Sequence, residues 1–129
     1  MTASHPNRAP RLLALSGSAR EGSINGKLVA VAAAKATALG AEVTSVDLRA
    51  LALPVFDADL IAAEGLPAGA RQLRDLMAAH DGVLLASPEY NALPTPLLIN
   101  ALDWLSVVQA EGDLPGGTVA TAGKPVGLM

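Results

Sequence analysis

RLLALSGSAREGSINGKL, residues 11–28, is the stretch that decides the fold. It opens with an apolar run, Leu12–Leu15, short enough to be a buried strand, and a helical pattern follows the polar loop. A strand, loop and helix of this kind direct free backbone N–H groups and the positive end of the helix dipole at one point. The hydroxyls of Ser18 and Ser23 and the guanidinium of Arg20 can converge there. The stretch therefore predicts a phosphate-binding loop, and the alternative is a serine-rich turn with Arg20 in solvent.

The composition predicts one domain with helices packed closely on a parallel sheet. The 129 residues fit a single domain of roughly 100–200 residues, and the apolar side chains are mostly Ala, Leu and Val, with only 2% aromatic. The formal net charge of -3 argues against nucleic acid and anionic membrane surfaces as partners. The absence of cysteine excludes disulfides and thiolate metal sites, and it agrees with a cytoplasmic location.

The first ten residues predict a flexible leader, and residues 11–129 a single domain. The leader is polar and broken by proline, and the apolar run after it is too short for a signal peptide. Charged side chains interrupt the most apolar region before it reaches the roughly 18 residues of a membrane span. The two histidines are too few and too far apart in sequence to indicate a metal centre.

Periodicity and turn residues predict alternating helices and strands through the rest of the chain. The expected helices are 26–39, 67–80 and 97–106, and the expected further strands are 43–47, 82–86 and 124–129. Gly40 is expected to end the first helix. The proline- and aspartate-containing segment 48–64 is expected to be a long loop.

The helical spacing also predicts which side chains face the core. On the first helix these are Leu28, Val31, Ala32 and Leu39. On the second helix they are Ala70, Leu73, Leu76, Met77 and His80, with Arg71, Gln72, Arg74 and Asp75 turned elsewhere. On the third helix they are Leu98, Ala101, Leu102 and Leu105.

Five polar or aromatic positions have two interpretations each. Asp57 and Asp59 are either an acid pair or, as we favour, turn residues that bond the backbone. His80 is either catalytic or, as we favour, the cationic end of a helix. Tyr90 lies in a polar loop, which favours a contact surface for a ring or subunit over packing of its own loop. Trp104 lies within an apolar helix, which favours core or subunit contact over ligand stacking.

Two motifs resemble the NAD(P)H-dependent FMN reductases, a flavodoxin-like family that includes quinone, azo-dye and chromate reductases. The first is Gly17-Ser18-x-Arg20-x-Gly22-Ser23-x-Asn25-x-Lys27-Leu28, and the second is Ser87-Pro88-Glu89-Tyr90-Asn91 with Asn100-Ala101-x-Asp103-Trp104 downstream. The resemblance covers Arg11 to Met129. It implies an α/β fold, a flavodoxin-like doubly wound parallel sheet, of which this sequence carries an incomplete four-strand portion. In that strand order ligands bind between the first and third strands, where the two motifs would meet.

The resemblance implies FMN as bound cofactor and NAD(P)H as co-substrate. Its cofactor-binding positions are Ser18, Arg20, Ser23, Ile24, Asn25, Pro88, Glu89, Tyr90 and Asn91. By this resemblance, the phosphate is bound by Ser18, Arg20, Ser23 and Asn25, and the isoalloxazine ring by the loop 88–91. Because a flavin performs the redox chemistry itself, no catalytic acid or base is expected. The resemblance further implies a small-molecule electron acceptor (a quinone, azo compound, metal oxyanion or free flavin) and a homodimer or homotetramer.

Two other functions stay open. One is a non-catalytic, truncated flavin-binding or assembly module. The other is a Rossmann dinucleotide domain with Asp47 on a ribose hydroxyl, which is disfavoured because residues 16–22 lack the G-x-G-x-x-G spacing.

The sequence departs from the family pattern in three places. Family members often have a glycine near Pro96 and a lysine near Ile99. They also continue past the fourth strand into elements that cover one face of the sheet, so the sequence looks truncated at its C-terminus. A bare apolar face predicts aggregation, a partner chain or a fragment.

Overall fold

A computed structural model of the protein describes residues 7–129, so most of the expected leader, residues 1–10, lies outside the described residues. Four parallel strands form the main sheet in the order β2-β1-β3-β6. They are β1 (Arg11–Ser16), β2 (Glu42–Val46), β3 (Gly82–Ala86) and β6 (Val126–Leu128). The chain winds from β1 to β2 and then crosses to β3 on the other side of β1, so the winding reverses between β1 and β3. This order confirms the doubly wound parallel sheet.

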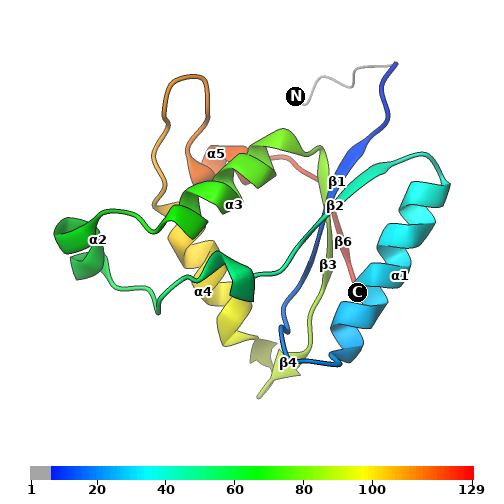
Figure 1. The fold of residues 1–129 in the computed structure, drawn as a ribbon, viewed down its shortest axis with the longest axis horizontal. Helices are drawn as coiled ribbons and strands as arrows, with labels where there is room; N and C mark the ends of the chain where they lie inside the picture. The colour runs from blue at the N-terminus through cyan, green and yellow to red at the C-terminus, as the bar shows by residue number, and fades with distance from the viewer. Residues whose placement is uncertain (1–6) are drawn as a thin grey trace.

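Helices cover the two faces of the sheet unequally (Figure 1). α1 (Ile24–Ala38) lies alone on one face. The other face carries α3 (Ala68–Ala79), α4 (Pro96–Ser106) and α5 (Gly117–Thr121). None of the helices within residues 7–129 has the length and apolarity needed to cross a membrane.

Three short elements within expected loops complete the fold. The turn η1 (Arg49–Leu51) and helix α2 (Ala58–Glu64) lie in the segment 48–64. A hairpin of β4 (Glu89–Tyr90) and β5 (Leu93–Pro94) follows β3. α2 forms because Asp57 caps it, its Oδ1 accepting from the backbone N of Asp59 at 2.9 Å. The turn role of Asp57 is thereby confirmed, and the purely loop-like prediction for 48–64 is wrong.

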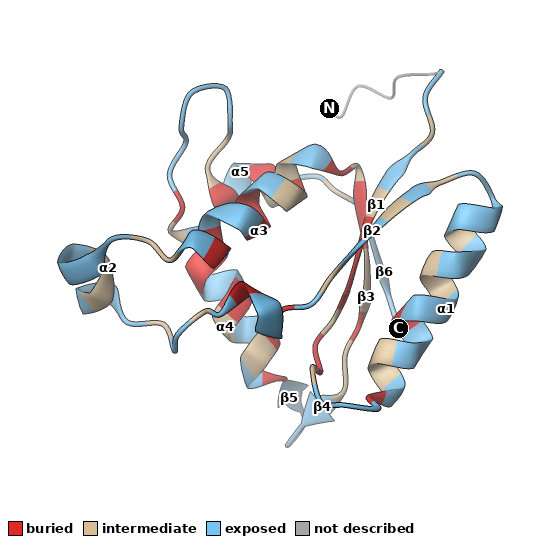
Figure 2. Ribbon diagram, in the orientation of Figure 1, coloured by how far each residue is buried: buried red, intermediate tan, exposed pale blue. Residues whose placement is uncertain are grey.

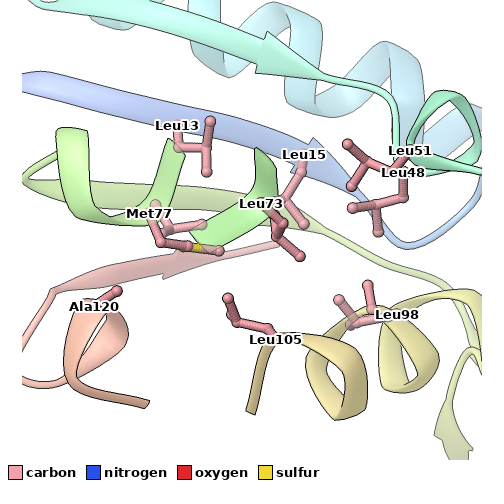
Figure 3. Close-up of a cluster of buried hydrophobic side chains, with 11 residues drawn as sticks. Leu13, Leu15, Leu48, Leu51, Leu73, Met77, Leu98, Leu105 and Ala120 are labelled. Atoms are coloured by element: carbon pink, nitrogen blue, oxygen red, sulfur yellow. The ribbon is translucent and has the colours of Figure 1, made fainter. Parts of the chain in front are cut away.

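The main hydrophobic core lies between the sheet and the layer of α3, α4 and α5. Figure 3 shows side chains of β1 meeting those of α3, α4 and η1, and Figure 2 shows buried residues concentrated on this side. The cluster includes Leu13, Leu15, Leu48, Leu51, Leu73, Met77, Leu98 and Leu105. Burial of each such leucine stabilises the fold by about 1.5–3 kcal/mol. The packing of α3, α4 and α5 on the sheet therefore supplies most of the hydrophobic stabilisation.

α1 buries fewer side chains against the sheet than α3 and α4 do, and not the ones that the helical spacing predicts. Val29 is the buried residue of α1 and packs against Ala14 and Ala86. Val31 and Leu39, expected in the core, are 53% and 90% exposed. Apolar residues occur around the whole helix, with Lys27 and Lys35 among them, so its sequence does not mark one buried face. Leu28, also expected in the core, is exposed as well.

The edge strand β6 exposes its apolar side chains. Leu128 is 72% exposed, and Val126 is also exposed on the same strand (Figure 2). β6 pairs with β3 along one edge within the described residues. Val126 and Leu128 pair with Val83 and Leu85 of β3, whose side chains pack in or against the main core, so the exposed side chains lie on the face of α3, α4 and α5 and not on the α1 face. The exposed apolar edge agrees with the open edge strand expected from the sequence.

Arg74 of α3 lies inside the protein, whereas the helical spacing turned it outward. Its side chain is 1% exposed. Its guanidinium donates to the carbonyls of Gln109 and Pro115 at 2.8 and 3.2 Å and to the carboxylates of Glu111 and Asp75 at 2.7 and 2.6 Å. These bonds, with those from Arg71, lower the pKa of Glu111. Arg74 therefore fastens the loop before α5 to α3, a long-range role that periodicity does not reveal.

Trp104 confirms the core interpretation, whereas Leu102 does not. Trp104 is fully buried, its indole N–H donates to the Pro54 carbonyl at 2.7 Å, and its ring meets Phe56 edge-on at 4.9 Å. Leu102 is exposed on the outer side of α4. The indole of Trp104 thus occupies the core position that the helical spacing predicts for Leu102.

His80 is buried at the end of α3, as the helix-end interpretation requires. Its Nδ1 lies 2.6 Å from the Leu76 carbonyl and its Nε2 lies 2.9 Å from Oγ1 of Thr44. Since a carbonyl only accepts, Nδ1 carries the proton and donates to the last turn of the helix. The side chain therefore joins α3 to β2.

Candidate functional site

The loops after β1 and β3 meet at the carboxyl edge of the sheet. The backbone N–H of Gly17 donates to the Ala86 carbonyl at 2.9 Å. The hydroxyl of Thr95 donates to the Gly17 carbonyl at 2.6 Å. A Cβ at position 17 would overlap the side chain of Ser87, so only glycine permits this approach. Thr95 is buried and also caps α4, its Oγ1 accepting from the N–H of Leu98 at 3.2 Å.

Local hydrogen bonds hold the loop after β1 in shape. The hydroxyl of Ser16 accepts from the N–H of Ser18 at 3.1 Å and donates to the Ser18 carbonyl at 3.0 Å. Gly22 has a φ of 69°, which favours glycine at that turn. Ser23 then caps α1, its Oγ accepting from the N–H of Gly26 at 3.1 Å. The serine-rich sequence therefore builds a fixed turn rather than a loose one.

Two cavities flank this loop at the edge of the sheet. One, of about 610 Å³, lies between the loop, α1 and β2 and includes Lys27 and Asp47 in its lining. The other, of about 310 Å³, lies between the loop, η1 and the start of α4 and includes Arg49 in its lining. Ser18 and Arg20 line both cavities.

The structure places some of the predicted site residues in the lining of these two cavities and others outside it. Ser18, Arg20 and Ser23 line the larger cavity, and Ser18, Arg20 and Tyr90 line the smaller one. The remaining predicted positions line neither cavity: Ile24 and Asn25 begin α1, and Pro88, Glu89 and Asn91 lie in the segment after β3. The sequence missed Ser87, Thr95 and Arg49, because the fold, and not a local motif, brings them to the loop after β1.

The larger cavity and the adjoining start of α1 together offer the donors that a phosphate requires. Ser18 is 8% exposed, and its hydroxyl has no hydrogen-bond partner among residues 7–129. The backbone N–H groups of Ile24 and Asn25, at the start of α1, also lack partners within that part of the chain. Neither Arg20 nor Lys27 takes part in the ion pairs of the described residues. A helix N-terminus with free donors and cations beside it suits the phosphate of a flavin nucleotide.

Comparison with known proteins identifies the family of the chain. Residues 10–129 match the NADPH-dependent FMN reductases. The chain belongs to that family. It is 38% identical over 117 residues to the quinone reductase of Escherichia coli (strain K12), covering 90% of this chain and 56% of that protein. It is also 38% identical over 118 residues to the probable NADPH:quinone oxidoreductase 1 of Oryza sativa subsp. japonica, covering 88% and 58%.

A solved relative shows the same fold. The chain superposes with a TM-score of 0.70 and 28% identity on FerB, a flavoenzyme NAD(P)H:(acceptor) oxidoreductase from Paracoccus denitrificans, over 94% of this chain and 60% of FerB. The chain thus spans little more than half the length of the FMN reductase relatives it matches.

Proposed function

We propose that the chain is the FMN-binding part of an NAD(P)H-dependent oxidoreductase that reduces a small molecule such as a quinone. The observation that carries this proposal is that Ser18, Arg20 and Ser23 of the loop after β1 line one cavity where the sheet reverses its winding. Membership of the NADPH-dependent FMN reductases and likeness to a quinone reductase support the same assignment.

In this proposal the chain's residues hold and orient the cofactor. Ser18, Arg20 and the first turn of α1 bind the phosphate, with Ser23 fixing that turn. The hairpin from Pro88 to Asn91 positions the ring. The hairpin is stiff because a two-residue turn closes it, with φ of 53° at Asn91 and 62° at Ala92.

The redox step needs no ionisable side chain of the chain itself. Bound FMN supplies the capacity to accept a hydride from NAD(P)H and to pass electrons to the acceptor. The role left to the protein is to place donors where charge develops and to fix the ring before the reductant arrives. The bonds of Gly17 to the Ala86 carbonyl and from the Thr95 hydroxyl provide that rigidity.

Anaerobic addition of NADPH to the FMN-loaded chain tests the proposal. Loss of the flavin's visible absorbance, followed by its return when a benzoquinone is added, is the expected result. Retention of FMN without any reduction by NADPH or NADH would contradict the enzymatic assignment and leave the flavin-binding module as the function.

We also propose that the protein forms a homo-oligomer through α4. The outer side of α4 exposes Ile99 and Leu102, and a cavity of about 550 Å³ beside it includes Val55, Phe56 and Ile99 in its lining. Apolar side chains grouped in this way mark an interaction surface. Sedimentation analysis should show a dimer or tetramer that Leu102→Asp shifts toward monomer, whereas a monomeric wild type would contradict this part.

We also propose a cytoplasmic location, because the proposed reaction consumes NAD(P)H, which is made inside the cell. Cell fractionation with the tagged protein tests it, and recovery of the protein mainly in an extracytoplasmic fraction would contradict it.

A further inference from the structure

Thr95 lies where the loop after β1 meets the start of α4. Its side chain is buried, 1% exposed, although it directly follows a hairpin whose residues 89–94 are all exposed. A threonine hydroxyl that is removed from water in this way needs partners within the fold. The partners that the structure gives it come from two elements that are far apart in the chain.

The hydroxyl of Thr95 connects two backbone groups. Its Oγ1 lies 2.6 Å from the Gly17 carbonyl oxygen and 3.2 Å from the backbone N of Leu98. Because a carbonyl only accepts and an N–H only donates, the direction of both hydrogen bonds is fixed. Each bond polarises the other, and the side chain thereby joins the loop after β1 to the first turn of α4.

The peptide between Gly17 and Ser18 is held on both sides. Its carbonyl accepts from Thr95, and its N–H, which belongs to Ser18, donates to Oγ of Ser16 at 3.1 Å. The N–H of Gly17 is also paired, with the Ala86 carbonyl at 2.9 Å. A glycine restricts its neighbouring peptides little because it has no Cβ. The hydrogen bonds, rather than the residue itself, therefore set the direction in which this peptide faces.

The local sequence fixes the place of the Thr95 hydroxyl. Thr95 has a φ of -67° and a ψ of 148°, the extended conformation of an N-cap residue. Pro96 follows, and a proline disfavours the helical region for the residue before it. A β-branched side chain also has few accessible χ1 rotamers. Backbone and side chain of Thr95 are therefore both restricted by local sterics.

We propose that Thr95 is a positioning residue of the candidate site, which holds the Gly17–Ser18 peptide in one orientation and keeps the loop after β1 aligned with α4. It acts through Ser18, which lines both cavities at this edge of the sheet. Without the hydroxyl, the peptide loses one of its two restraints, and Ser18 loses its fixed orientation. The effect on flavin binding rests on the proposed function, whereas the effect on the loop is measurable in the ligand-free chain.

Three substitutions separate this role from the capping of a helix. Thr95→Val keeps the shape of the side chain and removes the hydroxyl, whereas Thr95→Ser keeps the hydroxyl and removes a methyl group. Asp57→Ala is the control for loss of a helix cap alone. Asp57 caps α2 by accepting from the N–H of Asp59, and it lines neither cavity of the site.

Amide hydrogen exchange of the ligand-free chain tests the positioning directly. The N–H groups of Gly17 and Ser18 report on the loop, that of Leu98 reports on the helix cap, and that of Leu13 in the central strand reports on global unfolding. In Thr95→Val we expect exchange at Gly17 and Ser18 to become about tenfold faster or more, beyond any change at Leu13. Thr95→Ser should stay near the wild-type rates. Acceleration confined to Leu98 makes Thr95 a helix cap alone and overturns the proposal.

Flavin titration tests whether the fixed loop matters to the site. We expect FMN to bind Thr95→Val about tenfold or more weakly, with affinity recovered in Thr95→Ser and unchanged in Asp57→Ala. Faster exchange of the loop with unchanged FMN affinity overturns the positioning role and leaves the proposed function intact. A wild type that binds no FMN contradicts the proposed function instead, and the exchange rates of Gly17 and Ser18 then decide whether Thr95 fixes the loop.

The hydroxyl proton of the wild type provides a test that does not require Thr95→Val to fold. A hydroxyl that donates to a buried carbonyl exchanges slowly with water, so we expect a resolved NMR signal for the Thr95 hydroxyl proton. A nuclear Overhauser contact from it to the α protons of Gly17 would support the proposal. A Thr95 hydroxyl proton that exchanges too fast to be observed overturns it.

Discussion

Gly17 is the residue at which the two loops of the site come closest. Because a Cβ there would overlap Cβ and Oγ of Ser87, Gly17→Ala must displace one loop from the other. We expect this variant to lose about 2 kcal/mol or more of unfolding free energy, within the range for overpacked sites, and to bind FMN more weakly. Denaturant unfolding and flavin titration measure the two effects.

Gly26→Ala is the matched control for that change. An added Cβ at position 26 meets only Ser23 at ordinary contact distance, and the position is helical. Alanine there should stabilise the helix by about 0.5–1 kcal/mol. If Gly17→Ala were as stable as Gly26→Ala, the close contact of the two loops would not be what shapes the site.

Arg20 distinguishes phosphate binding from ring binding at the scale of one side chain. If its guanidinium holds the phosphate, Arg20→Ala should weaken FMN binding about tenfold or more, the value of one charge-assisted hydrogen bond, and leave riboflavin binding nearly unchanged. Lys35→Ala, a cation further along α1 that lines neither cavity, is the control. Equal losses for both flavins would contradict the assignment.

At the scale of elements, α3 and the loop before α5 depend on one buried guanidinium. Arg74→Ala leaves the carbonyls of Gln109 and Pro115 without their donor, whereas the half-exposed Glu111 keeps its bond from Arg71. Each such unpaired group costs about 1–3 kcal/mol, and we expect a loss of about 2 kcal/mol or more in chemical denaturation.

Arg71 is the internal comparison, because it lies on the same helix and bonds the same Glu111 at 3.1 Å but is half-exposed. Exposed pairs contribute about 0–1 kcal/mol, so Arg71→Ala should have a small effect. Comparable losses for the two variants would show that burial does not set the strength of this network.

The sequence predicted the elements that local patterns specify. The four strands and three long helices follow from apolar runs and periodicity, and Gly40 ends α1 with a φ of 99°. The buried sides of α1 could not be read, because Leu28 and Val31 are as apolar as Val29. Arg74 and Thr95 could not be placed either, since their partners lie 35 or more residues away.

The candidate site shows the same division between local and distant signals. Ser18, Arg20 and Ser23 belong to one local motif and line one cavity. Arg49 begins η1, which follows β2, so only the strand order brings it to the loop after β1. The positions of Pro88, Glu89 and Asn91 relative to a flavin remain predictions.

At the scale of the whole molecule, Arg8 and Asp81 tie the chain before β1 to the turn before β3. The Arg8 guanidinium bonds both oxygens of Asp81, and Oδ2 also accepts from the N–H of Arg11 at 2.8 Å. The bond from Arg8, followed by that from Arg11, lowers the pKa of Asp81 to about 2. A lowered pKa means that the folded state favours the ionised carboxylate.

The contribution of Asp81 should therefore vanish in acid. It is present above the unfolded pKa near 4 and is lost as the pH falls toward 2. We expect Asp81→Asn to be less stable than wild type at pH 7, and the difference to shrink between pH 4 and pH 2. Asp103→Asn is the control, because its carboxylate makes no hydrogen bond or ion pair within residues 7–129. A difference independent of pH would contradict the ionic role.

The central claim is that the whole folded chain uses the β1 loop to hold the phosphate of FMN. Parallel titrations of the 129-residue chain with FMN and with riboflavin, followed by quenching of flavin fluorescence, test it most directly. The account predicts saturable binding of FMN at least about tenfold tighter than that of riboflavin, the effect of one well-placed charge-assisted contact. Equal affinity for the two flavins, or no binding by a folded chain, would contradict it.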